Sequence, residues 1–233
     1  MKEKAIEYLN RDRLYHIDML ETLYRGIGEL VYADEHGAAV LNSGCTYMIS
    51  AQNEETLEKI CAEFERPLVI EMHQAEFVPW LQAKYAYRHT MESLQCAYLS
   101  KERLDEKLTE GVRLRGLSSE HLKFVLENYD HLSDEKYLAE RIEAGMIGAF
   151  IGDELAGFVG THDEGTMGIL QVLPEFRRRG IAYSLEAAMI NRQLELGYVP
   201  HAHIVTTNKA SIQLQEKLGL SFADKTVTWL YDE

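Results

Sequence analysis

The order of strand-like and helical segments in the second half of the chain limits its fold more than any other feature. From residue 146 onward, three apolar strands with tight turns are followed by a helix, a strand, a helix and a last strand. These segments cover residues 146–151, 155–161, 167–173, 180–196, 201–205, 208–218 and 226–231. Strands joined by tight turns pair antiparallel. With two helical stretches ahead of them, these segments predict a mixed α/β unit and not a purely alternating one.

The first half repeats a shortened version of this order. Its expected elements are a helical stretch over 1–30, strands at 38–41 and 46–50 around the turn Asn42-Ser43-Gly44, a helix capped by Asn53, a strand at 68–70, a helix at 77–85 and a strand at 94–99. The charged segment 101–111 suits an exposed connection between domains. We therefore expect a first domain over residues 1–105 and a second over 111–233.

A weak internal repeat relates the two halves. With an offset of 133 residues, Leu81, Gln82 and Lys84 align with three identical residues, which are Leu214, Gln215 and Lys217. Three matches fit a diverged duplication, and they also fit two unrelated α/β units.

The charge balance limits the partners. The 233 residues include 38 acidic and 24 basic ones, a formal net charge of −14 at pH 7, which repels nucleic acids and anionic membranes. Residues 1–7 are charged where a secretory signal is apolar, and no segment approaches the roughly 18 apolar residues of a membrane span. The three cysteines, Cys45, Cys61 and Cys96, lie far apart in the sequence and cannot all pair. This is typical of proteins from a reducing compartment, where thiols stay free. We expect a cytoplasmic protein that binds neither a nucleic acid nor a membrane.

One basic loop stands out against this acidic background. Arg177, Arg178 and Arg179 directly precede Gly180, where the long helix starts, and Pro174 ends the strand before them. The first turn of a helix has unpaired N–H groups and a positive dipole end, and glycine lets a phosphate approach the backbone. The loop is therefore a candidate diphosphate site. The alternative is a solvated basic turn that offsets nearby acids.

The loop also resembles a family motif. Arg177-x-x-Gly180-x-Ala182 is similar to the acyl-CoA pyrophosphate signature of the GNAT superfamily of N-acyltransferases, and the Asn208-headed helix follows in the order that this family shows. The resemblance covers residues 112–233. It is greatest to the glycine N-acyltransferase-like branch, which places a degenerate GNAT-like domain in front of the catalytic one. The resemblance implies a GNAT-like acyltransferase fold in the second half and a smaller, degenerate version in residues 1–100.

The resemblance also implies which residues bind acetyl-CoA. The backbone of the central strand would bind the pantetheine arm, the N–H groups of the basic loop and first helical turn would bind the pyrophosphate, and Asn208, otherwise a plain helix cap, would contact the pantetheine. The implied cofactor-binding residues are Gln171, Val172, Leu173, Arg177, Arg178, Arg179, Gly180, Ile181, Ala182, Tyr183 and Asn208. The corresponding turn of the first half, residues 51–55, has two carboxylates and no glycine, so we expect no CoA there.

The usual acid and base of the family are missing. Thr166 stands where many members have a glutamate that acts as general base, and Gln215 stands where many have a tyrosine that acts as general acid. As replacement base we favour His203, which alternates with His201 on one strand face, and place Glu164 second. Their alternatives are a structural histidine and a solvated turn acid. Two histidines could also suggest a metal, but no third ligand lies nearby in the sequence, so we expect none.

These observations predict an acyl-CoA-dependent N-acetyltransferase that moves an acetyl group from acetyl-CoA to a primary amine of a small molecule by direct attack. The acidic balance favours a cationic acceptor and the branch resemblance favours glycine, so the acceptor stays open. The alternative, motivated by Thr166 and Gln215, is a non-catalytic module that binds or senses CoA and carries a partner-binding first domain. Whether the protein forms a homodimer also stays open.

Overall fold

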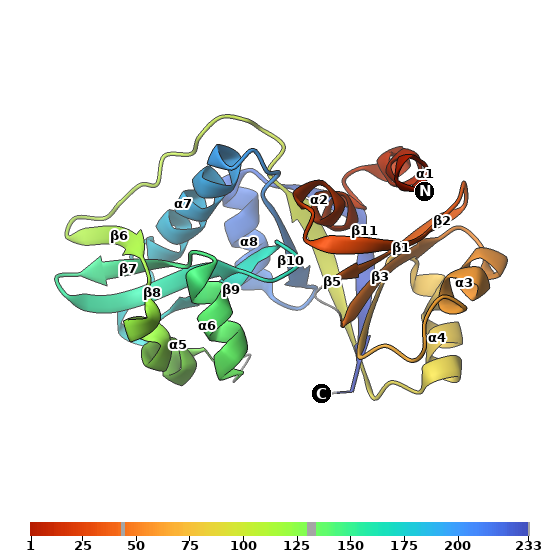
Figure 1. Ribbon diagram of the computed structural model, residues 1–233. Helices are drawn as coiled ribbons and strands as arrows, with labels where there is room; N and C mark the ends of the chain where they lie inside the picture. Colours follow the sequence, from red (N-terminus) through yellow and green to blue (C-terminus); the bar gives the residue numbers. More distant parts are fainter. Residues whose placement is uncertain (43–44, 130–133, 233) are drawn as a thin grey trace. The chain divides into compact units, whose positions relative to one another are not determined.

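The computed structural model of the chain describes residues 1–42, 45–129 and 134–232 (Figure 1). The expected turn at Ser43 and Gly44 lies outside these described residues. The chain divides into two compact units, each of which combines segments that are distant in sequence. The first comprises Met1–Ala97, His203–Ile212 and Ser221–Glu233, and the second comprises Tyr98–Ala202 and Gln213–Leu220. These ranges differ from the continuous domains expected from the sequence, whose boundaries stay a prediction.

The first unit is built on a seven-stranded mixed sheet in the order β1-β2-β3-β4-β11-β5-β10 (Figure 1). Its elements are α1 (Lys2–Leu9), η1 (Asn10–Asp12), α2 (Ile17–Arg25), β1 (Gly28–Ala33), β2 (Gly37–Asn42), β3 (Thr46–Ala51), α3 (Glu54–Cys61), β4 (Val69–Met72), η2 (Ala75–Phe77), α4 (Val78–Tyr85), β5 (His89–Ala97), β11 (Ser221–Tyr231) and the end of β10 (His201–Val205). β3 and β4 pair parallel, and β11 pairs antiparallel with both β4 and β5. The last strand of the chain thus lies inside this sheet.

Consecutive apolar residues give this sheet two buried faces. On β2, Ala38 and Val40 pack with α1 and α2, whereas Ala39 packs with the cluster that contains α3 and α4 residues. Successive side chains of a strand point to opposite faces, so a run of apolar residues here requires helices on both sides. The first unit is therefore a three-layer arrangement around its sheet.

The helical stretch expected over residues 1–30 ends earlier than predicted. Gly26 takes the left-handed conformation (φ +69°) and its N–H bonds the carbonyl of Thr22, which ends α2. β1 then starts at Gly28 and pairs with β2. Ile27 and Leu30 are three residues apart, as on one helix face, but the glycine cap ends the helix before them.

The second unit contains a four-stranded antiparallel sheet in the order β6-β7-β8-β9. Its elements are β6 (Val112–Gly116), η3 (Ser119–His121), α5 (Leu122–Asn128), α6 (Glu135–Glu143), β7 (Ile147–Ile151), β8 (Glu154–Thr161), β9 (Met167–Val172), η4 (Pro174–Phe176), α7 (Ile181–Glu195) and the end of α8 (Lys209–Leu218). Phe150 and Phe158 pack with α5 and α6 residues in one cluster, and α7 contacts β7, β8 and β9. None of the helices among the described residues has the length and apolar character needed to cross a membrane.

A β-bulge interrupts the pairing of β8 and β9. Phe158 pairs with Gln171 and Gly160 pairs with Gly168, so two residues of β9 oppose one residue of β8. Ile169 in this bulge has φ +51°, an uncommon conformation for a β-branched residue. Bulges turn backbone groups out of the regular ladder and often lie next to functional sites.

The expected fold class is confirmed, because the chain is a mixed α/β structure, and from residue 112 onward the helices and strands follow the order read from the sequence. The repeat with offset 133 has a structural counterpart. Ala86 follows α4 and Gly219 follows α8, 133 residues later, and both adopt left-handed backbone conformations. A strand follows each of them.

Candidate functional site

The basic loop leads directly into the uncapped start of α7 in the second unit. Arg178 and Gly180 both have positive φ, +64° and +81°, so the chain turns sharply between η4 and the helix. A Cβ on Gly180 would lie 3.6 Å from Thr109 Oγ1, so its backbone conformation, more than lack of space, favours glycine. Arg177, Arg178 and Arg179 are exposed. The loop therefore presents three cations and a bare helix N-terminus to solvent.

Two hydrogen bonds hold this loop. Arg177 donates from Nε to the carbonyl of Val172 at 3.0 Å, and Thr109 Oγ1 donates to the carbonyl of Arg179 at 2.6 Å. Both bonds use carbonyl oxygens as acceptors, whereas the N–H of Arg177 already donates to the carbonyl of Pro174 at 3.3 Å. The backbone donors that could meet a ligand are therefore those that follow Arg177. Lys107 Nζ lies 4.7 Å from the centre of the Tyr183 ring and adds a further cation near the first helical turn.

The start of α3 in the first unit differs from that of α7. The Asn53 side chain accepts a hydrogen bond from the N–H of Thr56 at 2.9 Å, and Glu54 and Glu55 lie in the first turn. Gly180, the N-cap of α7, makes no side-chain cap. A side-chain oxygen and two carboxylates at α3 compete with phosphate, so the anion-binding character predicted for α7 is absent from this described part of the first unit.

Glu164 is buried beside the position where the family has its base. Thr166 Oγ1 donates a hydrogen bond to Glu164 Oε1 at 2.5 Å, and Glu164 is only 8% exposed. Burial, and to a lesser degree Asp163, raise the pKa of Glu164 to about 8, whereas the bond from Thr166 acts in the opposite direction. Glu164 is therefore not the solvated turn acid of the alternative interpretation, and it changes protonation close to neutral pH.

Tyr137 and His162 form a second polar pair in this unit. Tyr137 Oη lies 2.9 Å from His162 Nδ1, and burial lowers the pKa of His162 to about 4. His162 also lies against Gly168, where a Cβ would approach its Nε2 to 2.5 Å. This pair was not predicted from the sequence. The position of His162 directly after β8 is the one signal that could have identified it.

Glu186 is a further buried carboxyl group of the second unit. It lies on α7, is 2% exposed, and has a pKa raised to about 7 by burial. Its side chain hydrogen bonds Gln215, the residue at the family's tyrosine position, and this bond acts against the rise. Each of the two departures from the family pattern, Thr166 and Gln215, thus has a buried glutamate as neighbour.

The two histidines of β10 are both engaged. His201 is buried, and its Nδ1 lies 3.0 Å from the carbonyl of Val199. The His203 side chain is 8% exposed, its Nε2 donates a short hydrogen bond to Gln95 Oε1, and the same nitrogen lies 3.4 Å from Glu71 Oε1. The expectation that no metal ligands surround His203 considered only sequence neighbours. The fold brings carboxylates from distant segments to it.

The implied CoA-binding residues belong to both units. Gln171, Val172 and Leu173 end β9, and the loop and helix start at 177–183 follow them within the second unit. Asn208 belongs to the first unit, and its Oδ1 accepts the N–H of Ser211 at 3.1 Å, so it caps α8. The second unit thus brings the strand end, the basic loop and Glu164 into one compact body.

Comparisons with known proteins agree with this fold. A family model described as FR47-like protein matches residues 146–230. A protein from Drosophila has a similar structure, with a TM-score of 0.66 and 20% identity over 83% of this chain and 73% of that chain. A GCN5-related N-acetyltransferase-like protein from Streptococcus suis is similar at a TM-score of 0.60 and 14% identity over 97% of this chain and 99% of that one.

A tandem GNAT protein from the clavulanic acid biosynthesis pathway is similar at a TM-score of 0.50 and 14% identity, covering 92% of this chain and 86% of that chain. Among proteins with curated descriptions, no relative matches the sequence. The glycine N-acyltransferase-like branch stays a prediction. The chain has the fold of the GNAT acetyltransferase structures, and its residues 146–230 match the FR47-like family model.

Proposed function

We propose that the chain is an N-acetyltransferase that moves the acetyl group of acetyl-CoA to a primary amine of a small molecule. The observation that carries the proposal is the basic loop Arg177–Gly180 at the uncapped start of α7, directly after the bulged strand β9. Helix N-termini with glycine and arginine bind phosphate groups, and CoA carries a diphosphate and a 3′-phosphate. The similarity to GNAT structures supports the same ligand class.

The residues of the second unit suit direct attack. The amine nitrogen forms a bond to the thioester carbonyl carbon, the carbon–sulfur bond breaks, and the CoA thiolate leaves. Of the two predicted bases, we assign Glu164 to accept a proton from the ammonium group of the acceptor, which frees the lone pair of the amine for attack, because its pKa of about 8 suits that transfer. The backbone at the β9 bulge would donate to the carbonyl oxygen as charge develops there.

His203 is the weaker candidate for this proton transfer. Its Nε2 already donates to Gln95, and its neighbours Asp18 and Glu71 are carboxylates. A base needs a free lone pair at the atom that receives the proton. We therefore propose that His203 has a different role.

The alternative is binding of CoA without turnover, with the first domain contacting a partner. Thr166 and Gln215 support it, because neither can act as acid or base at neutral pH. Thiol release from acetyl-CoA across a panel of amines, including polyamines and glycine, distinguishes the two. Release with at least one amine supports the enzyme, and tight CoA binding with no release from any amine supports the sensing module.

The variant Gly180→Glu tests the proposed CoA-binding site. A carboxylate at the helix start repels the diphosphate, and φ +81° strains any side chain. We expect loss of CoA binding by calorimetry. Gly197→Glu is the matched control, because Gly197 follows the other end of α7 at φ +78° with open space around it. Unchanged CoA affinity in Gly180→Glu would contradict the proposed binding site.

A further inference from the structure

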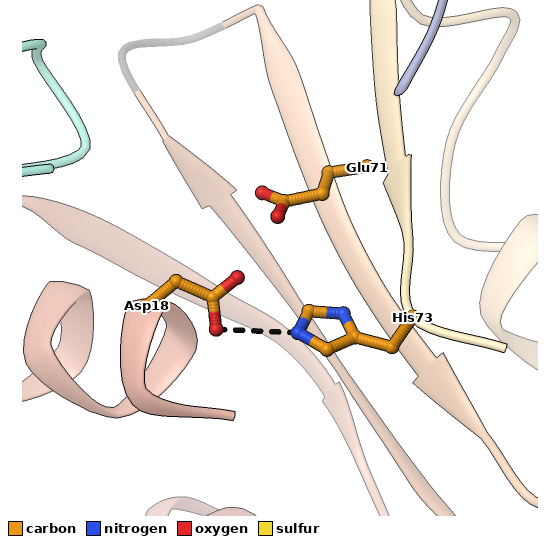
Figure 2. A group of neighbouring side chains, drawn as sticks. All are labelled: Asp18, Glu71 and His73. Carbon is orange, nitrogen blue, oxygen red and sulfur yellow. Dashed lines mark hydrogen bonds and ion pairs between the residues drawn. The ribbon is translucent and has the colours of Figure 1, made fainter. Parts of the chain in front are cut away.

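Three buried side chains in the first unit form a compact group of metal-ligand type (Figure 2). Asp18 lies on α2, Glu71 lies on β4, and His73 directly follows β4. All three are 0% exposed, and one ligand atom of each lies within 4.8 Å of the others. Glu71 and His73 are two residues apart on an extended segment, so they share the face of the sheet that α2 covers.

The ring of His73 is oriented by its backbone bond. Its Nδ1 lies 3.2 Å from the carbonyl oxygen of Ile49, which can only accept, so Nδ1 carries the proton of this bond. Nε2 therefore presents a lone pair in the neutral ring, and it faces Asp18 Oδ1 at 3.2 Å. A proton or a metal cation has to lie between these two acceptors. Histidine ligands of metal ions typically donate their other ring N–H to a carbonyl in this way.

Asp18 offers a second oxygen to the same space. The Asp18 side chain also hydrogen bonds Glu71, and its buried Oδ2 lies 3.6 Å from His203 Nε2. Its Oδ1 accepts from Gln95 Nε2 at 3.2 Å, which fixes the carboxylate plane. Two ionised carboxyl groups buried this close together cost free energy unless a proton or a cation compensates their charge.

His203 supplies a fourth donor from β10, a strand at one edge of the same sheet. Its Nε2 lies 3.4 Å from Glu71 Oε1 and 3.6 Å from Asp18 Oδ2. Two imidazole nitrogens and two carboxylates are a donor set that suits zinc and similar ions better than magnesium or calcium. Binding would displace the proton that His203 Nε2 now donates to Gln95, so metal uptake releases a proton.

We propose that Asp18, Glu71 and His73, with His203 as the fourth ligand, bind one divalent transition-metal ion of the zinc class inside the first unit. The ion would neutralise two buried carboxylates and join α2, β4 and β10. It is a structural site, since three of its ligands are fully buried and the His203 side chain is only 8% exposed. This inference does not depend on the proposed acetyl transfer.

Cobalt(II) is the probe, because it occupies zinc sites and absorbs visible light. The full chain is freed of metal with a chelator, refolded with Co²⁺ and dialysed, and bound cobalt is measured by elemental analysis. We expect about one equivalent of Co²⁺ per chain, with visible bands that Zn²⁺ removes by competition. Less than about a tenth of an equivalent, without visible bands, would overturn the proposal in favour of protons shared within the group.

Variants locate the ion. His73→Gln and Glu71→Gln should each lose the bands and most of the bound cobalt. His16→Gln is the matched control: His16 is a buried histidine of the same unit whose ring centre lies 5.1 Å from that of His73, and it is not in the ligand group. It should keep the bands. Circular dichroism identifies variants that fold, and cobalt bound equally by a folded His73→Gln or Glu71→Gln chain would also overturn the site.

Discussion

In the proposed mechanism, Glu164 replaces the base that is missing at Thr166. Thr166 cannot act as a base, yet its hydroxyl donates to a buried carboxyl group two residues earlier whose pKa is raised to about 8. The base function that the family places on the strand would here belong to the preceding turn. In that mechanism the pKa of Glu164 would also set the pH range of turnover, because only the deprotonated carboxylate accepts a proton.

Glu164→Gln should therefore lower turnover by roughly 10²- to 10⁴-fold, the usual contribution of a general base. Wild-type turnover should rise with pH to a plateau above about 8, and the variant should lose this rise. Thiol-release rates between pH 6 and 9 measure both. Glu175→Gln, an exposed acid of η4, is the control. A variant with wild-type rates across this range would exclude Glu164 as the base.

Glu186 leads to a prediction about stability. Burial raises its pKa from 4.5 to about 7 in the folded chain, so the fold favours the protonated form. This contribution is fully present below about pH 4.5 and is lost as pH rises through about 7. Glu186→Gln stays neutral, so we expect it to be more stable than wild type at pH 8 by on the order of 3 kcal/mol, and similar at pH 4.5.

Urea unfolding at the two pH values measures this difference. Glu195→Gln on the same helix is the control, because its side chain is 59% exposed and pairs with Arg103 at the surface. It should change the unfolding midpoint little at either pH. An equal stability difference at pH 4.5 and pH 8 for Glu186→Gln would show that the Glu186 carboxyl group is not shifted.

At the scale of elements, β11 is the strand on which the first unit depends most. It lies between β4 and β5, with Thr228 opposite Met72 on one side and opposite Glu92 on the other. Its Val227 and Leu230 are fully buried. The sequence predicts that residues 226–231 form a strand, but alternation of apolar residues carries no information on which strand becomes its neighbour.

Leu230→Ala tests this placement. Leu230 packs in the cluster that contains Leu57, Ile70 and Leu81 of the first half, so truncation leaves a cavity there. We expect a loss of roughly 2–5 kcal/mol in the free energy of unfolding. Leu196→Ala, at a residue that is 55% exposed, is the control and should cost little. A loss below about 1 kcal/mol for Leu230→Ala would indicate that β11 is not a central strand.

At the scale of the whole molecule, local patterns predicted the order of elements well. Turn residues and helix caps act over a few residues, so Asn53, Gly197 and Gly219 mark element ends that the structure retains. The buried group of Asp18, Glu71 and His73 could not be predicted in this way. Its members belong to separate segments, and only the fold brings them within 4.8 Å. The basic loop was predictable because all its parts are consecutive in the sequence.

The position of β11 has a consequence for synthesis. A ribosome releases β4 and β5 long before residues 221–231, so until that strand emerges the two earlier strands lack the neighbour that separates them in the sheet. The nascent first half therefore exposes strand edges of the kind that promote aggregation. Completion of the first unit is thereby tied to translation of the second, and a chain cut short before β11 leaves the sheet of the first unit without its central strand.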